Sequence, residues 1–400
     1  MACFRSRLFL FAFLAVGQAR LFALSLDSLL ALALRNNPDL AASRQGSVVA
    51  AQDTLLPRVM DNPVLSAEAM HNLTEPGRPK AGFRLSQEFR PGYRGAQKRL
   101  AKSDWAAAVA TEKAREADLV TEVGSLWWSW QILHRKQALQ QAVADRWESL
   151  ARISSAKVAE GRLSEVEEAQ ARLDQANASQ RVAESQSAKL ALEQRLRYLA
   201  QAPSEPLDTV ATDSLPRLPP MDSILARLAA NSPELKTLDA EIAARKAELE
   251  WQRAARTASL KVSAGYDRES EGSNLVGGGI ELPLALFNRN RTGIAKAQAS
   301  LRESELRRNA ARLRLASEAR QAQTRLLGLA GRYGDYAARI RPLSRKQLAL
   351  SEKGFRQGLL GIFELSRIQQ ESLAQELEAL DLFDGYQQEW IRLNRSLGEK

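Results

Sequence analysis

The chain contains one short segment twice. Residues 27–40 read DSLLALALRNNPDL and residues 222–235 read DSILARLAANSPEL, at an offset of 222 − 27 = 195 residues. Each copy has a helical apolar pattern that stops at an Asn shortly before a proline, where a second helix can begin because its first residue needs no free N–H. We therefore expect each half to open with two short helices, the first capped by its Asp-Ser pair.

The repetition extends over the rest of the chain. Adding 195 to the segment FRLSQEFRPGYRG, at 83–95, gives GGIELPLALFNRN at 278–290, and the motif that follows Gly161 returns after Gly358, at an offset of 358 − 161 = 197. The 400 residues are thus predicted to be two copies of one unit, at 24–202 and 221–400. A Pro-rich linker at 203–220 joins them.

The first 23 residues have the pattern of a signal peptide. Arginines precede the apolar run Leu8–Val16, and small residues follow it. Cleavage after Ala23 would remove three arginines, lowering the formal charge from +10 to +7, and would also remove Cys3, the only cysteine. Cys3 precedes the apolar run instead of following it, so we expect an exported protein without a lipid anchor.

Four segments alternate between apolar and polar residues, which indicates strands with one wet face. They form two predicted hairpins, at about 63–89 and 259–284, with polar loops beginning at His71 and Asp267. A strand of about nine residues rises about 30 Å, which suits a tilted membrane-spanning strand. No stretch has the ~20 apolar residues of a transmembrane helix, so any membrane span is expected to be β. Four strands cannot close, so several chains would share one barrel. A small soluble sheet with one buried face fits the pattern equally well.

Between the strands, long stretches have helix-forming composition. Residues 92–202 are expected to form a helical hairpin with arms of about 65 and 40 residues, turning at Gly161 and restarting with a capping box of Ser164 and Glu167. A second hairpin at about 288–398 turns at Gly358, with a bend at Pro342 and loosening at Gly328, Gly331 and Gly334. A coiled-coil seam is predicted at Val166, Ala169, Leu173, Ala176, Ala183 and Leu190.

No catalytic or metal-binding constellation is evident. His71 and His134 have no acidic partners at ligand spacing, and Gly277–Gly279 lacks the Lys-Ser/Thr of a phosphate loop. Trp127, Trp128 and Trp130 are interpreted as packing residues. The positive charge has no basic patch interleaved with aromatics, and export argues against nucleic acid. We expect no enzyme, no cofactor and no metal site.

These features together resemble the TolC-like outer-membrane efflux protein family. The likeness rests on the NNPDL and NSPEL elbows, the junctions LSQEFRPGYRG and ELPLALFNRNRTGIAKAQA, and the two Gly-centred helix turns. The second junction is similar to the heavy-metal, CzcC-like subgroup. The resemblance implies a mainly α chain whose long hairpins form a periplasmic α-barrel and whose four strands contribute to a trimeric 12-stranded outer-membrane β-barrel.

The resemblance also implies partners and a functional tip. It implies a homotrimer in the lipid of a Gram-negative outer membrane, extending into the periplasm to a periplasmic adaptor and an inner-membrane efflux transporter of the resistance-nodulation-division type. Its cargo would be metal cations or small toxic compounds. Family members often carry acidic rings at the tip, and the matching positions, six residues after Gly161 and Gly358, are Glu167 and Glu364. Arg367 falls where some relatives have a second acid.

An alternative of another class is a non-conducting periplasmic adaptor or structural coiled-coil protein. Adaptors also carry long helical hairpins with β parts. They do not normally contain the whole helix–hairpin–helix unit twice, and they need no bilayer-length strands, so the efflux channel is the favoured interpretation.

Overall fold

The computed structural model describes residues 23–70, 80–202, 205–210, 212–269, 273–284 and 289–399. The proposed signal peptide, except for Ala23, lies outside the described residues, as does the first hairpin loop with His71. Both interpretations stay predictions.

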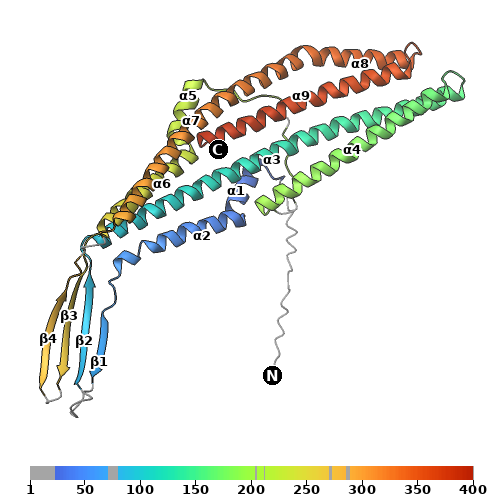
Figure 1. Ribbon diagram of the computed structural model, residues 1–400. Helices are drawn as coiled ribbons and strands as arrows, with labels where there is room; N and C mark the ends of the chain where they lie inside the picture. Colours follow the sequence, from blue (N-terminus) through green and yellow to red (C-terminus); the bar gives the residue numbers. More distant parts are fainter. Residues whose placement is uncertain are drawn as a thin grey trace, which may run out of the picture.

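Each half has the same order of elements (Figure 1). The first half comprises α1 (Leu26–Asn36), α2 (Pro38–Asp53), a 3-10 turn (Leu56–Arg58), β1 (Val64–Met70), β2 (Lys80–Phe89), α3 (Tyr93–Ala159) and α4 (Glu165–Ala200). The second comprises α5 (Met221–Asn231), α6 (Pro233–Ala254), β3 (Leu260–Arg268), β4 (Asn274–Glu281), α7 (Arg291–Asp335), a π-helical turn (Tyr336–Ile340), α8 (Arg341–Arg356) and α9 (Ile362–Leu397). Helix α5 repeats α1 at an offset of 221 − 26 = 195, and α9 repeats α4 at 362 − 165 = 197.

The molecule is long and narrow, with the sheet at one end and the two helical turns at the other (Figure 1). Helix α3 alone has 67 residues, which at 1.5 Å per residue gives about 100 Å. None of the described helices is long and apolar enough to cross a membrane.

The elbows form as expected, but their first caps differ. The cap of α1 is Ser25, whose hydroxyl accepts from the Ser28 N–H at 3.3 Å, and α5 starts after Pro220 without a side-chain cap. The expected Asp-Ser cap is therefore wrong, because each helix begins earlier and the Asp lies in its first turn, where it faces the positive end of the helix dipole. Asn37 caps α2 and also donates to the Leu199 carbonyl at 3.1 Å, which ties the first elbow to the end of α4.

The sheet has the order β1-β2-β3-β4, all antiparallel. Partners across an antiparallel pair point to the same side, so the register defines two faces. One face carries the large apolar side chains, which are exposed because no helix covers them. They include Leu65, Phe83, Leu85, Phe89, Val262, Tyr266, Val276 and Ile280. The expected period of two is confirmed. Among the described residues, no helix packs on this apolar face, which the alternative of a small soluble sheet would require.

Three hydrophobic clusters hold the helices together. The first joins α1, α3 and α4 around Trp127 and Trp130. The second joins the two helical hairpins near their turns around Trp147 and Phe355, and the third joins α5, α7 and α9 around Leu326. Trp127 and Trp130 are buried, in agreement with a packing role.

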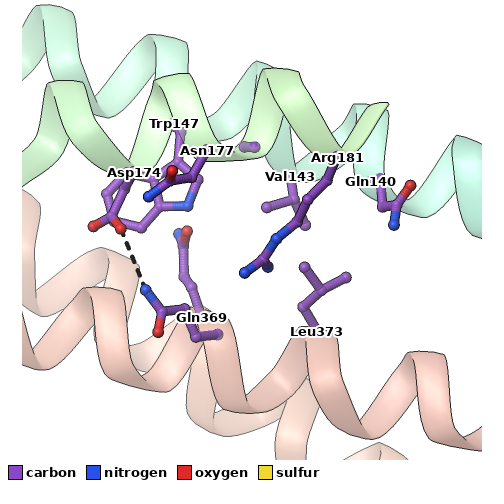
Figure 2. A pocket seen from close by; sticks show the side chains of 10 residues that line it. Gln140, Val143, Trp147, Asp174, Asn177, Arg181, Gln369 and Leu373 are labelled. Carbon is purple, nitrogen blue, oxygen red and sulfur yellow. Dashed lines mark hydrogen bonds between the residues drawn. The ribbon is translucent and has the colours of Figure 1, made fainter. Parts of the chain in front are cut away.

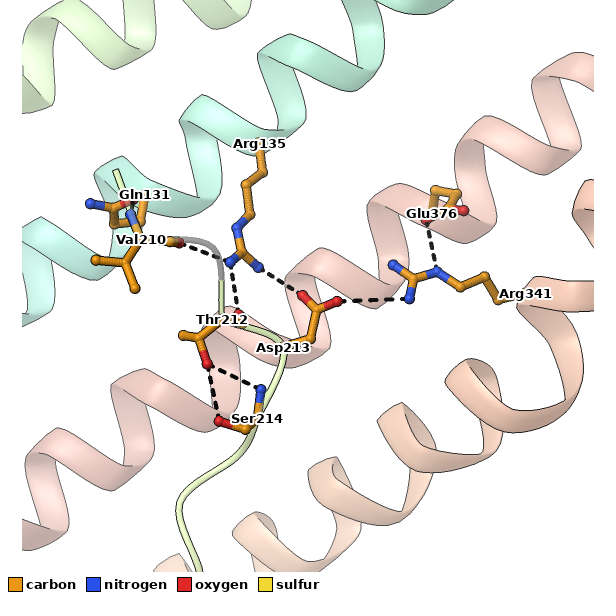
Figure 3. Close-up of polar contacts among 8 residues, drawn as sticks. All are labelled: Gln131, Arg135, Val210, Thr212, Asp213, Ser214, Arg341 and Glu376. Carbon is orange, nitrogen blue, oxygen red and sulfur yellow. Dashed lines mark hydrogen bonds and ion pairs between the residues drawn. The ribbon is translucent and has the colours of Figure 1, made fainter. Parts of the chain in front are cut away.

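The linker between the halves is docked along the helices (Figure 3). Leu24 and Leu207 form a short parallel bridge. Gln131 of α3 contacts the backbone of Asp208 and Val210. Arg135 donates to the Asp213 carboxylate at 3.1 Å, and that carboxylate also lies 3.8 Å from Arg341 of α8. The linker therefore fixes the position of one repeat against the other.

The predicted seam of α4 faces away from its partner helix. Val166, Leu173 and Leu190 are exposed, whereas Ala171, Ala178 and the polar Asp174 and Ser185 are buried. The prediction followed the largest apolar side chains, but the smaller ones allow the close approach inside the hairpin.

The second long arm is interrupted where Pro342 predicts it. The π-helical turn lies directly before α8, in which Pro342 occupies the first turn. Helix α7 runs without a break through Gly328, Gly331 and Gly334, so the expected loosening there is wrong. Burial of the opposite face against α9 keeps that segment helical.

Phe355→Ala is expected to destabilise the helical part by about 3–5 kcal/mol, since this side chain is 1% exposed in the cluster between the hairpins. Phe363→Ala is the matched control because Phe363 is 53% exposed nearby. Guanidinium unfolding followed by the helical circular dichroism signal measures the stability of both variants. An equal loss of stability in the two would contradict the packing described.

Candidate functional site: the helical tip

Both helical hairpins turn through the same backbone motif. Gly161 and Gly358 have φ of 68° and 76°, in the left-handed region that glycine enters without strain. The Arg162 N–H donates to the Lys157 carbonyl and the Leu359 N–H to the Gly354 carbonyl, at 2.8 and 2.9 Å. With the bonds from the two glycine N–H groups, these contacts make two Schellman motifs, which end α3 and α8 as predicted.

The two returning helices begin differently. Ser164 caps α4 in a reciprocal capping box with Glu167. The Ser164 N–H donates to the Glu167 carboxylate at 3.0 Å, and the Ser164 hydroxyl accepts from the Glu167 N–H. Helix α9 has Gly361 at the same place without a side-chain cap. Glu364 thus occupies the same third helical position as Glu167 but caps nothing.

The hydrogen bonds with Ser164, first from its backbone and then from its side chain, lower the pKa of Glu167 below its ordinary value of 4.5. The carboxylate is therefore charged at neutral pH, at the positive end of α4.

The tips of the two hairpins are joined directly. The Lys157 ammonium donates to the Phe355 carbonyl at 2.8 Å and lies 4.5 Å from the centre of the Phe355 ring. It thereby satisfies a carbonyl near the C-terminus of α8, where a positive charge is favourable. The structure thus brings Gly161 and Gly358 to the same end of the molecule.

Arg367 does not pair with Glu364. Its guanidinium lies 3.4 Å from the carboxylate of Glu371, one turn further along α9. Glu364 and Arg367 are both exposed near the turn. Among the tip residues predicted from the sequence, Glu364 is therefore the exposed carboxylate without a capping role.

A buried carboxylate between the hairpins was not predicted. Asp174 of α4 is 5% exposed and accepts from the Ser366 hydroxyl at 2.6 Å and from Gln370 at 3.2 Å, both on α9. Figure 2 shows it at the wall of a small polar cavity that Gln369 and Arg181 also line. The sequence signal for it is its helical phase with the buried Ala171 and Ala178.

The tip offers charge and surface but no reactive group. Among the described residues, no group of three or more His, Cys, Asp or Glu side chains is placed to hold a metal ion. His134, far from the tip in α3, has a lowered pKa because burial disfavours its charged form. Exposed Leu359 and Phe363 flank the second turn, as a surface for contact with another protein would require.

A sheet with a free apolar face at one end, joined to two long helical hairpins, is the TolC-like architecture that the sequence predicts. A membrane protein from Pseudomonas aeruginosa superposes with a TM-score of 0.82 at 17% identity, covering 94% of this chain and 90% of that one. The channel-forming protein CusC gives a TM-score of 0.78 at 17% identity, covering 94% and 92%. These likenesses establish the fold.

Sequence comparison points in the same direction. Residues 224–399 match the outer membrane efflux protein family. The cobalt-zinc-cadmium resistance protein CzcC of Cupriavidus metallidurans is 28% identical over 281 residues, which span 68% of this chain and 66% of CzcC. These matches agree with the resemblance expected from the sequence, and the expected TolC-like fold is confirmed.

Glu167→Gln is expected to weaken the start of α4 by about 1 kcal/mol, with about fivefold faster amide hydrogen exchange in its first turn. Since the folded-state pKa is lowered, this stabilisation is present above pH 4.5 and is lost as the pH falls through the folded-state pKa. Glu364→Gln, without a cap to lose, is the control. Equal changes in α4 and α9 would contradict the capping assignment.

Proposed function

We propose that this chain is one of three identical subunits of an outer-membrane channel, the exit duct of a tripartite efflux system. The observation that carries the proposal is the sheet. It presents large apolar side chains along one face, and mainly charged and small residues on the other, with Val64, Met70 and Leu275 as the apolar exceptions. Each edge strand is unpaired within the described part of the chain.

Exposure of its apolar face makes this sheet unfavourable in water. Val276 is 85% exposed and stands with Ile280, Tyr266 and Phe83 on one face. In lipid this face is favourable, but the free edges of β1 and β4 are not, because lipid offers no hydrogen bonds to them. Pairing β4 of one copy with β1 of the next removes every edge when three copies close a ring of twelve strands.

The helices support the same ring. Figure 1 shows the order α8, α9, α3, α4 across the hairpins, so α8 and α4 form opposite flanks. Exposed leucines seven residues apart lie on α8, at Leu343 and Leu350, and the exposed Val166 and Leu173 are seven apart on α4. Each flank is thus an unpartnered seam of coiled-coil spacing, and in the ring α8 of one copy faces α4 of the next.

The likeness to efflux proteins and the exposed tip support a proposal for the partners and the cargo. The joined turns at Gly161 and Gly358 would meet the periplasmic adaptor, which connects the duct to an inner-membrane transporter. The likeness to a cobalt-zinc-cadmium resistance protein favours divalent metal cations as cargo, ahead of small organic toxins. The duct would lie in the outer membrane of a Gram-negative bacterium after removal of residues 1–23, without a lipid anchor and without catalytic activity.

The test uses adjacent residues on opposite faces of β4. Val276→Arg puts a charge into lipid at a cost of about 2–4 kcal/mol, so the yield of trimers extracted from outer membranes should fall. Gly277→Arg is the control, since Gly277 lies on the other face and a Cβ added there would meet no other atom within 4 Å. Wild-type protein should run as a heat-sensitive trimer and conduct in planar bilayers. A soluble periplasmic monomer would contradict the channel and favour an adaptor.

We propose further that Glu364, with Glu167, sets ion preference at the tip, since three copies of each would surround one axis. Glu364→Gln should lower the cation-to-anion permeability ratio in planar bilayers with little change in thermal stability, because Glu364 has no capping role. Glu167→Gln should change both. An unchanged ratio in intact trimers of the double variant would leave both residues as helix-terminal charges only.

A further inference from the structure

The polar face of the sheet has several positions without a side chain. Glycines occupy four positions on it, one on β2, one on β3 and two on β4: Gly82, Gly265, Gly277 and Gly279. Glycine weakens a strand unless something approaches closely or space is needed. Gly278 lies at a position of the opposite, apolar face. Of the three consecutive glycines in β4, only the first and the last therefore belong to the polar face.

Two of these glycines lie opposite charged residues. On β2 and β3 the register pairs Gly82 with Asp267 and Arg84 with Gly265. A Cβ on Gly82 would collide with the Asp267 carboxylate, and a Cβ on Gly265 would lie 3.6 Å from Nε of Arg84. Each charged side chain therefore lies flat across the glycine of the neighbouring strand.

Both charges are left without an ion-pair partner. Within the described part of the chain, no carboxylate lies within 4.0 Å of the Arg84 guanidinium and no cation within 4.0 Å of Asp267, whereas Lys261 pairs with Glu281 at 3.1 Å on the same face. Glu68 stands in the same row, since Gly82 also pairs with it. Each chain thus presents two carboxylates and one guanidinium near this level, a net charge of 1 − 2 = −1.

We propose that Arg84 and Asp267 are specificity-determining residues of the exit section of the duct, and that Gly82 and Gly265 set how far they project. This inference rests on the proposed channel, in which the polar face lines the lumen. Three copies then give a net charge of −3 around one axis. The charges act on a permeating ion while the lumen stays wide, because their side chains lie against the wall.

The geometry has a functional consequence for small substitutions. A methyl group at Gly82 collides with the Asp267 carboxylate and also lies 3.3 Å from the Tyr266 carbonyl, so the carboxylate is displaced into the lumen with a small shift of the neighbouring strand. Asp267 and Arg84 act in opposite directions on a cation. Removing the first should disfavour cations, and removing the second should favour them.

The experiment measures conductance and reversal potential of purified trimers in planar bilayers with potassium chloride. We expect Asp267→Asn to lower and Arg84→Gln to raise the cation-to-anion permeability ratio, each about twofold. Gly82→Ala should lower single-channel conductance by roughly a quarter. Gly278→Ala is the matched control without effect, since its Cβ would make only ordinary contact, at 3.6 Å, with the Ser263 carbonyl on the apolar side.

A swap of the pair separates the proposed mechanism from general damage. The double variant Gly82→Asp with Asp267→Gly moves the carboxylate to β2 and the glycine to β3, and its conductance and permeability ratio should equal those of the wild type. In Gly82→Asp alone, both quantities should differ from those of the wild type. Conducting trimers whose ratio and conductance are the same in wild type, Asp267→Asn, Arg84→Gln and Gly82→Ala would overturn this inference and leave the channel standing. Wild-type trimers that do not conduct would overturn both.

Discussion

The backbone hydrogen bonds at the two edges of the sheet are the constraint on which the rest of the structure depends. Within the described part of the chain, strands β1 and β4 each have one edge whose backbone N–H and C=O groups lack a partner strand. The large exposed apolar face of the sheet disfavours a location in water, where these groups could bond to solvent. If three copies satisfy these edges, as proposed, the direction of every following element is fixed. The junctions at Gly92 and Asn290, both with positive φ, then start α3 and α7 at the rim of the sheet, and both helices pack against α6.

The duplication explains why the helical part can be so long with so little core. Small residues such as Ala171 and Ala178 allow the helices to approach closely, and a few large side chains, such as Trp147 and Phe355, pack between the two hairpins. Elsewhere between the repeats, the docked linker and the Asp213 ion pairs add polar contacts to this apolar packing. The tie between Lys157 and Phe355 does the same at the tip.

The sequence predicts most of this architecture because its signals are local. Gly161 with Ser164 and Glu167 specifies a turn and a cap within seven residues, and strand alternation specifies two faces. The buried Asp174 was missed because its partners, Ser366 and Gln370, are almost two hundred residues away and come into contact only through folding. The predicted seam on α4 is exposed in the chain for a related reason: periodicity shows that a face is apolar, but not which helix covers it. The cap of α1 shifted to Ser25 because several polar residues compete at that end.

The π-helical turn at Tyr336–Ile340 makes the two arms mechanically unequal. Helix α3 is one uninterrupted rod, whereas the corresponding arm of the second repeat carries a wide turn followed by Pro342, which has no N–H to donate. Bending the second arm there sacrifices fewer hydrogen bonds than bending the first anywhere along its length. A ring built from three such chains would alternate stiff and compliant helical arms around its axis.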